Sequence, residues 1–208
     1  MQLSSGRGLG ADVITFGPDE LQLGAGPTLT VVDALGLDGR PTRAIADLAT
    51  LTEEFGSLDG RHVLAVGEGN TSGAALALAA ALTPGLRLTL RCPKGYQVPD
   101  RILDLAAQLS GGGAQVAQVT HPDEVEDGPV DAVYTSRRQT MGVSEADPVR
   151  LTAFEGFRID SVFLDRFSGP QTVLLHDLSA VRGQEVTDSV LGRKPIMTGF
   201  RQGHDIRS

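Results

Sequence analysis

The stretch His62–Leu82 constrains the fold of this chain more than any other part of its sequence. Apolar residues at 63–66 lead into a turn, Gly67-Glu68-Gly69-Asn70, and then into a run rich in alanine and leucine. Since both are strong helix formers, the pattern predicts a strand, a glycine turn and a helix. Such a unit directs backbone N–H groups and the positive helix end toward an anion. A ligand site is therefore expected at Gly67–Ser72, with a nucleotide as the first ligand to consider.

From Arg61 onward, strand and helix patterns alternate. Strands are expected at 62–66, 86–92, 114–120, 131–136, 172–178 and 195–200, and helices at 71–82, 99–110, from Pro122, between 148 and 167, and at 185–191. This alternation favours an α/β fold with a doubly wound, mainly parallel, Rossmann-like sheet. Ligands of such sheets bind beyond the carboxyl ends of the strands, which selects the loops 67–72, 92–96, 136–142 and 176–183.

The first part of the chain is less regular. The segments ADVITFG (11–17) and TLTVVDALG (28–36) are typical of strands. Two strands alone are marginally stable in water, so they are expected to pair with the main sheet or with another copy of the chain. Residues 42–55 carry apolar side chains at helical spacing, with Asp38 or Thr42 as the N-cap and Gly56 as the end.

Composition narrows the classes of partner and cofactor. The net charge of -8 argues against nucleic acid or an anionic membrane as a partner. No apolar run approaches the ~20 residues of a membrane span, and no signal pattern precedes the first strand, so the default expectation is a cytoplasmic protein. The single cysteine, Cys92, and four scattered histidines make a metal site improbable. No cofactor is expected.

The strand that follows the glycine turn argues against a nucleotide ligand. Residues 67–73, GEGNTSG, match a dinucleotide fingerprint only loosely. The fingerprint needs a carboxylate at the end of the next strand to bind a ribose hydroxyl. That strand ends in Leu90-Arg91-Cys92-Pro93, which has none. The glycines also have a purely structural interpretation, because they let strand and helix pack closely.

Several blocks together carry a family signature. They are PTRAIADLATLTEEFGSLDGRHVLAVGEGN, CPKGY, DAVYTS, TMG and HDLSAVRGQEVTD, in this order and spacing. Over roughly residues 28–200 the chain resembles the ornithine and aspartate carbamoyltransferases, the ornithine type in particular. The resemblance implies two lobes, one for carbamoyl phosphate and one for the amino acid. Residues 1–37 would be a two-strand remnant of the first lobe, and 38–208 a Rossmann-like amino-acid-binding domain.

The carbamoyl-phosphate motifs depart from the family pattern. Nothing in residues 1–60 resembles the family's Ser-Thr-Arg-Thr-Arg loop, so the resemblance implies that most of that lobe is absent. The His-Pro-x-Gln motif, which contacts the carbamoyl group, is Arg40-Pro41-Thr42-Arg43 here. Both the histidine and the glutamine positions thus hold arginine, and Arg40 and Arg43 become candidate ligand-binding residues.

The amino-acid motifs are present but altered. By resemblance, Asn70 holds the substrate carboxylate, with Thr71 beside it, and the loop Thr140-Met141-Gly142 matches the family's Ser-Met-Gly. The family's aspartate for the ornithine α-amino group is Ser136, and it is followed by Arg137 and Arg138. Guanidinium groups bind carboxylates or phosphates, so the expected ligand is more anionic than ornithine. The alternative is that the two arginines are solvated loop residues.

The family's His-Cys-Leu-Pro motif is His176-Asp177-Leu178-Ser179 here. His176 and Asp177 offer an acid–base pair at a strand end. Alternatively, His176 only binds backbone. Leu178 is a candidate substrate contact, and serine in place of proline removes the usual reason for a cis peptide bond. Arg182 matches the family arginine near the carbamoyl carbonyl, and is the third candidate catalytic residue.

Three functions are consistent with these residues. The first is a repurposed biosynthetic enzyme that acts on a small anionic or amino-acid-like metabolite and is not competent alone for carbamoyl transfer. The second is a carbamoyltransferase that needs a partner chain for carbamoyl phosphate. The third is a non-catalytic metabolite-binding or scaffold protein. For each of these functions, the strand edges and apolar side chains in residues 1–55 would be exposed to water unless a partner packs on them. A homodimer or higher oligomer through that region is therefore expected.

Overall fold

The computed structural model describes residues 41–136, 148–177, 183–191 and 196–197. Within them a parallel sheet has six strands in the order β3-β2-β1-β4-β5-β6. The strands are β1 (His62–Val66), β2 (Arg87–Arg91), β3 (Gln115–Val119), β4 (Val130–Ser136), β5 (Ser168–Asp177) and β6 (Ile196–Met197). The doubly wound α/β architecture expected from the sequence is confirmed. The predicted strands 11–17 and 28–36 lie outside the described residues.

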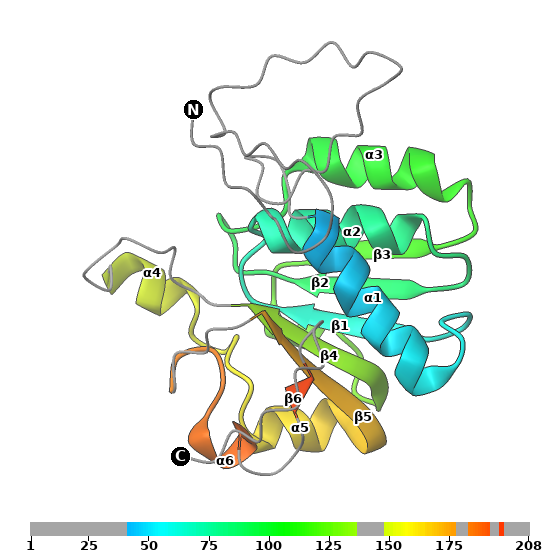
Figure 1. The fold of residues 1–208 in the computed structure, drawn as a ribbon. Helices are drawn as coiled ribbons and strands as arrows, with labels where there is room; N and C mark the ends of the chain where they lie inside the picture. Colours follow the sequence, from blue (N-terminus) through cyan, green and yellow to red (C-terminus); the bar gives the residue numbers. More distant parts are fainter. Residues whose placement is uncertain (1–40, 137–147, 178–182, 192–195, 198–208) are drawn as a thin grey trace, which may run out of the picture.

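Helices cover both faces of this sheet (Figure 1). One face carries α1 (Pro41–Phe55), α2 (Thr71–Ala81) and α3 (Asp100–Ser110). On the other side lie α4 (Pro148–Ala153), α5 (Ser161–Phe167) and α6 (Asp188–Leu191). A short 3-10 helix, η1 (Pro122–Glu124), precedes β4. None of the helices in the described ranges is long and apolar enough to cross a membrane.

Alternation along the strands divides the core into two layers. Val63 and Ala65 of β1 pack in the layer under α1–α3, whereas Leu64 and Val66 pack in the layer with α5. Successive strand residues point to opposite faces, and β4 follows the same division from Ala132 onward, after an irregularity between Val130 and Ala132. In β5, Leu175 faces α1–α3 and Leu174 faces α5. This alternation decides which side chains can meet at the sheet edge.

Helix α2 forms as the composition predicts. Eight of its eleven residues are buried, so the alanines let the helix lie close to both the sheet and its neighbours. Asn70 caps it, accepting from the backbone N–H groups of Ser72 and Gly73 at 3.0 and 3.1 Å. A capping amide of this kind satisfies N–H groups that have no partner inside the helix.

Helix α1 begins one residue earlier than expected. It starts at Pro41, a favoured first helical residue, so Thr42 lies inside the helix and is not its cap; Asp38 is outside the described residues. Gly56 ends the helix as predicted, with a φ of 74° and its N–H donating to Thr52 O. The helix does not bury all its apolar residues, since Ile45 is 63% exposed.

The chain after β5 differs from the expected helix at 185–191. The structure has only α6, Asp188–Leu191. Residues 185 and 187 instead bond to the chain before α5: Ile159 N–H donates to Glu185 O at 2.9 Å and Thr187 N–H donates to Ile159 O at 3.1 Å. A bridge of this kind uses the backbone groups that a helix would need.

Cys92 follows β2 and is 2% exposed. Burial is the main cause that raises the pKa of its thiol to about 12. Since the thiolate is the reactive form, Cys92 is an inert packing residue.

Candidate functional site

The carboxyl ends of β1 and β4 meet where the strand order reverses, which is the position where doubly wound sheets bind ligands. Asn70, in the turn after β1, donates from Nδ2 to Ser136 Oγ at the end of β4, over 3.1 Å. Its Oδ1 is occupied by the cap of α2. An amide nitrogen carries two N–H groups, so within the described residues one remains for a ligand.

Asp177 ends β5 beside Ser136, its register partner in β4. Its Oδ2 accepts from Ser72 Oγ at 2.6 Å, and its Oδ1 lies 3.5 Å from Arg43 Nη1. Asp177 is 8% exposed and therefore needs these partners. Arg43 also donates from Nη2 to the carbonyl of His176 at 2.8 Å, which fixes α1 over the end of β5.

A second carboxylate lies on the other side of Arg43. Asp47, one turn along α1, is 1% exposed, and the Arg43 Nε lies 3.2 Å from its carboxylate. Tyr134 of β4 is buried close by. Burial first, and then the charges of Asp47 and Asp177, raise the pKa of its phenol well above the ordinary value. The phenol therefore stays protonated and can only donate or accept a hydrogen bond.

These contacts form one connected set, which we call the edge network. It runs from Ser136 through Asn70, Ser72, Asp177 and Arg43 to Asp47. Two carboxylates and one guanidinium give it a formal charge of -1. In the described parts of the chain, no three His, Cys, Asp or Glu side chains gather in a way that could hold a metal ion. The network is thus organised for hydrogen bonding and charge pairing.

The structure does not bring His176 and Asp177 together as an acid–base pair, and this prediction is corrected. The two residues are consecutive in β5, so their side chains point to opposite faces of the sheet. His176 is 0% exposed, and its Nε2 lies 3.2 Å from Oε1 of Glu185, itself 1% exposed. The alternative, a bond to backbone, is replaced by this buried side-chain pair.

The turn after β1 is tied to α4. Arg150 binds both carboxylate oxygens of Glu68, at 3.2 and 2.6 Å, and lies over the rings of Tyr96 and Phe154 at 5.1 Å. A two-pronged contact of this kind is directional and stronger than a neutral hydrogen bond. The Glu68–Arg150 pair therefore orients the turn that carries Asn70.

The structure places six of the thirteen candidate residues. Arg43, Asn70, Ser136 and Asp177 meet in the edge network, Thr71 begins α2 beside it, and His176 lies on the opposite face. The others lie outside the described residues: Arg40, Arg137, Arg138, Thr140, Met141, Leu178 and Arg182.

Two residues of this region, Asp47 and Tyr134, were not expected from the sequence, and Ser72 was expected only as the end of the ligand loop 67–72. Asp47 and Ser72 belong to the edge network, and Tyr134 lies buried beside it. Only Asp47 had a usable signal, because Arg43 and Asp47 are four residues apart in a helical pattern and such pairs face each other. Ser72 donates to Asp177 of β5, and Tyr134 lies beside Ser72 of α2 and Asp47 of α1, so these partners are distant in sequence.

Comparison with known proteins gives a consistent family. The family model for the aspartate/ornithine carbamoyltransferase Asp/Orn binding domain matches residues 59–202. Ornithine carbamoyltransferase of Haloquadratum walsbyi is 35% identical over 179 residues, covering 83% of this chain and 55% of that protein. The enzyme of Methanoculleus marisnigri is 38% identical over 162 residues, or 77% of this chain and 50% of the relative. The chain spans about half the length of the curated relatives that it matches.

Solved structures agree with this comparison. Ornithine carbamoyltransferase from Pyrococcus furiosus superposes with a TM-score of 0.71 at 27% identity, over 78% of this chain and 52% of the other. The enzyme from Gloeobacter violaceus superposes with a TM-score of 0.67 at 30% identity, over 79% of this chain and 54% of the other.

Proposed function

The chain belongs to the aspartate/ornithine carbamoyltransferase family, and on that premise we propose that it binds and transforms a small amino-acid-like or anionic metabolite by a reaction other than ornithine carbamoylation. The observation that carries this proposal is the ion pair of Arg43 with Asp177. These residues stand at positions that the family resemblance assigns to a glutamine and a cysteine. The pair introduces two formal charges where the ordinary reaction uses none.

The edge network favours a ligand with separate acidic and basic ends. The remaining N–H of Asn70 is a donor for a carboxylate at the N-terminal end of α2. Asp177, whose Oδ1 lies 3.5 Å from Arg43 Nη1, is the proposed acceptor for an amino group. Ser136 carries no charge, so the family's usual pairing of an aspartate with the α-amino group is not available there. We further propose that Arg137 and Arg138 add preference for a further acidic group.

A second function rests on the extent of the sequence similarity. At 35% identity to an ornithine carbamoyltransferase, the chain could supply the amino-acid site of a carbamoyltransferase whose carbamoyl-phosphate site lies on another polypeptide. The non-catalytic binding protein remains the third hypothesis. Both use the same ligand site. The second differs from the first function in the reaction, and the third differs from it by the absence of turnover.

The activity test combines carbamoyl phosphate with ornithine or aspartate and measures the ureido product by colorimetry. Purified chain should form neither citrulline nor carbamoylaspartate above the uncatalysed rate. A full-length ornithine carbamoyltransferase serves as the positive control. Turnover by the chain alone would overturn the first function.

Ligand binding is tested by thermal shift over a panel of amino acids and dicarboxylates. A compound at 100 times its Kd should stabilise the protein by about 2.7 kcal/mol. Asp177→Asn should abolish most of the shift, because it removes the proposed acceptor for the amine. Asp104→Asn, an equal charge change on the exposed face of α3, should leave it unchanged. Turnover of the bound compound then separates enzyme from binding protein.

We also propose a homodimer or higher oligomer that uses residues 1–55. Ile45 of α1 is 63% exposed, and an exposed branched apolar side chain on a helix is a suitable contact between copies. Light scattering at micromolar concentration should give at least twice the monomer mass. Ile45→Glu should lower that mass, whereas Val149→Glu, at a site that is 72% exposed on α4, should not. A monomeric wild-type protein contradicts the proposal.

A further inference from the structure

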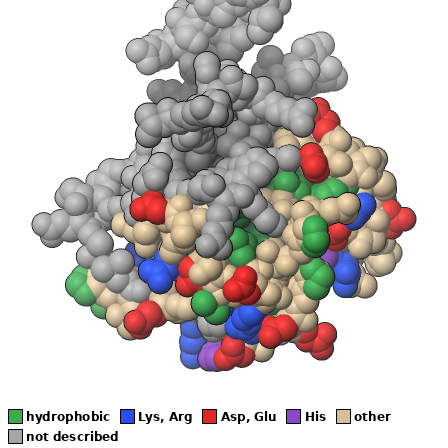
Figure 2. Space-filling view, turned by 90° about the horizontal axis from the view of Figure 1, so that it is seen from below, with side chains coloured by type: hydrophobic (Ala, Val, Ile, Leu, Met, Phe, Trp, Pro, Cys, Tyr) green, Lys and Arg blue, Asp and Glu red, His purple; other side chains and the backbone are tan. Residues whose placement is uncertain are grey.

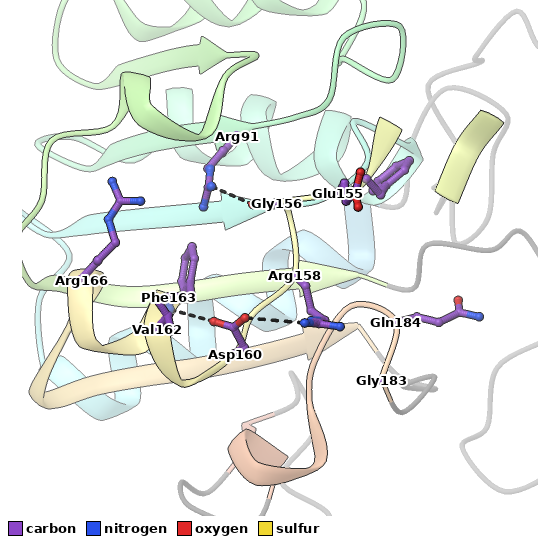
Figure 3. A pocket seen from close by; sticks show the side chains of 11 residues that line it. Arg91, Glu155, Gly156, Arg158, Asp160, Val162, Phe163, Arg166, Gly183 and Gln184 are labelled. Atoms are coloured by element: carbon purple, nitrogen blue, oxygen red, sulfur yellow. Dashed lines mark hydrogen bonds and ion pairs between the residues drawn. The ribbon is translucent and has the colours of Figure 1, made fainter. Parts of the chain in front are cut away.

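A cavity of about 600 Å³ lies on the α5 face of the sheet, away from the edge network (Figure 3). The end of β2, the α4–α5 connection, α5 and the segment after β5 form its wall. Apolar wall residues are Phe154, Val162 and Phe163, and the charged ones are Arg91, Glu155, Arg158, Asp160 and Arg166. In the view of the molecule from the side of α5 and α6, basic, acidic and hydrophobic side chains lie interspersed (Figure 2).

Arg91 is the unusual residue of this wall. It ends β2 and is 2% exposed. Its Nη2 donates to Gly156 O at 2.9 Å, but its Nε and Nη1 have no acceptor among the described residues. Three phenylalanine rings surround the guanidinium, with ring centres 5.3–5.9 Å from its central carbon: Phe157, Phe163 and Phe167.

This environment is costly for a cation. Burial, with a smaller contribution from Arg166, lowers the pKa of Arg91 to about 10, and Asp123 opposes the shift. The guanidinium therefore remains charged at neutral pH. A buried charge without a paired carboxylate is strongly destabilising, and the aromatic rings offset only part of that cost. A residue in this state is well suited to receive an anion.

Three of the other charged wall residues have partners, and Glu155 is an exposed carboxylate. Asp160 caps α5 through Phe163 N–H at 2.9 Å, and Arg158 lies 3.8 Å from it at the rim. Arg166 binds Asp127 at 2.7 Å. Figure 3 shows Arg91 projecting from β2 toward the α4–α5 connection, with Phe163 beneath it. Arg91 therefore stands as the main cation of the inner wall, with Arg158 at the rim.

We propose that this cavity binds a small organic anion, with a carboxylate or phosphate head held by Arg91 and an apolar body against Phe154 and Val162. The covered nitrogens of Arg91 lie beneath the wall, so binding shifts a wall side chain such as Phe163, whose ring centre is 5.4 Å from the guanidinium. The cavity faces away from Asp177, and its occupancy does not depend on the proposed function.

The test is calorimetric titration of the full chain with phenyl phosphate, benzoate, inorganic phosphate and benzamide. Phenyl phosphate or benzoate should bind with a Kd of about 1 mM or tighter. Neutral benzamide, which has the same apolar body, should bind at least about ten-fold more weakly. The stronger of the two anions identifies the head group, and inorganic phosphate measures the contribution of that head alone.

Variants locate the binding. Arg91→Met should weaken it by about ten-fold or more, since the fork of N–H donors is lost. Arg87→Met is the matched control, because Arg87 is on the same strand and face but is exposed, and it should leave binding unchanged. Asp177→Asn and Arg43→Met should also leave it unchanged, which separates this site from the edge network.

Three results would overturn the proposal: no binding of any anion to the wild-type protein, equal affinity for benzamide and benzoate, or full affinity in Arg91→Met. If Arg91→Met does not fold, nuclear magnetic resonance on the wild-type protein decides. The Nε–H signal of Arg91 should shift during titration with phenyl phosphate, and an unchanged signal at saturation rejects the site.

Discussion

Replacing Gly69 with alanine should lower the free energy of unfolding by about 3 kcal/mol or more and should abolish ligand binding at the edge network. A Cβ at this position would fall on the backbone of Gln97 and Val98, which cannot move aside as a flexible side chain can. Gly69 N–H also donates to Tyr96 O at 2.7 Å, so the two loops are held in contact. Urea unfolding gives the change in stability.

Gly73→Ala is the matched control for this prediction. Its Cβ would lie 3.4 Å from Glu68 O and 3.6 Å from the Val98 side chain, which is ordinary contact. Because Gly73 is inside α2, alanine should be neutral or stabilise by up to about 1 kcal/mol. Equal effects of the two substitutions would show that close loop contact at Gly69 does not limit the fold.

Arg43→Met should destabilise the protein by about 3 kcal/mol, because it leaves Asp47 and Asp177 without their shared guanidinium. The side chain of Arg43 is 20% exposed and that of Asp47 only 1%, so water cannot fully replace the lost contact. Removing the charge of Asp177 as well, in Arg43→Met/Asp177→Asn, should recover part of the loss. Chemical denaturation of the single and double variants measures the coupling.

Arg61→Met provides the comparison for a surface ion pair. Arg61 lies 2.6 Å from Asp131, but the two side chains are 36% and 26% exposed. Loss of this pair should lower the free energy of unfolding by no more than about 1 kcal/mol.

Additive effects of Arg43→Met and Asp177→Asn on the free energy of unfolding would contradict the interpretation that the edge network acts as a unit.

The fold could be predicted from sequence because its signals are local and repeated. Apolar runs, glycine turns and helix formers place β1, α2 and β2 within one residue of their observed ends. The segment after β5 resisted prediction because the backbone bonds of residues 185 and 187 go to Ile159, a partner distant in sequence. Periodicity within a segment carries no information about such a partner.

The site was predictable in part, for a related reason. The carboxyl-end rule brings Asn70, Ser136 and Asp177 together, since it depends on strand order alone. The prediction that His176 and Asp177 form a pair did not take account of strand alternation. Because their side chains point to opposite faces of the sheet, His176 contacts Glu185 and Asp177 contacts Ser72. Asp47 was missed because only apolar residues were used to find the buried face of α1. Its carboxylate can be buried there because Arg43 pairs with it.

The strand order 3-2-1-4-5-6 has a consequence for how the molecule assembles. Strands β1, β2 and β3 follow one another in the chain and can associate early, but pairing of β1 with β4 joins Val63 to Ala132 and must close a long loop first. The edge network crosses this seam, with Asn70 and Ser72 on the earlier half and Ser136 and Asp177 on the later one. A ligand bound at the proposed site would contact both halves of the sheet and is expected to stabilise their pairing.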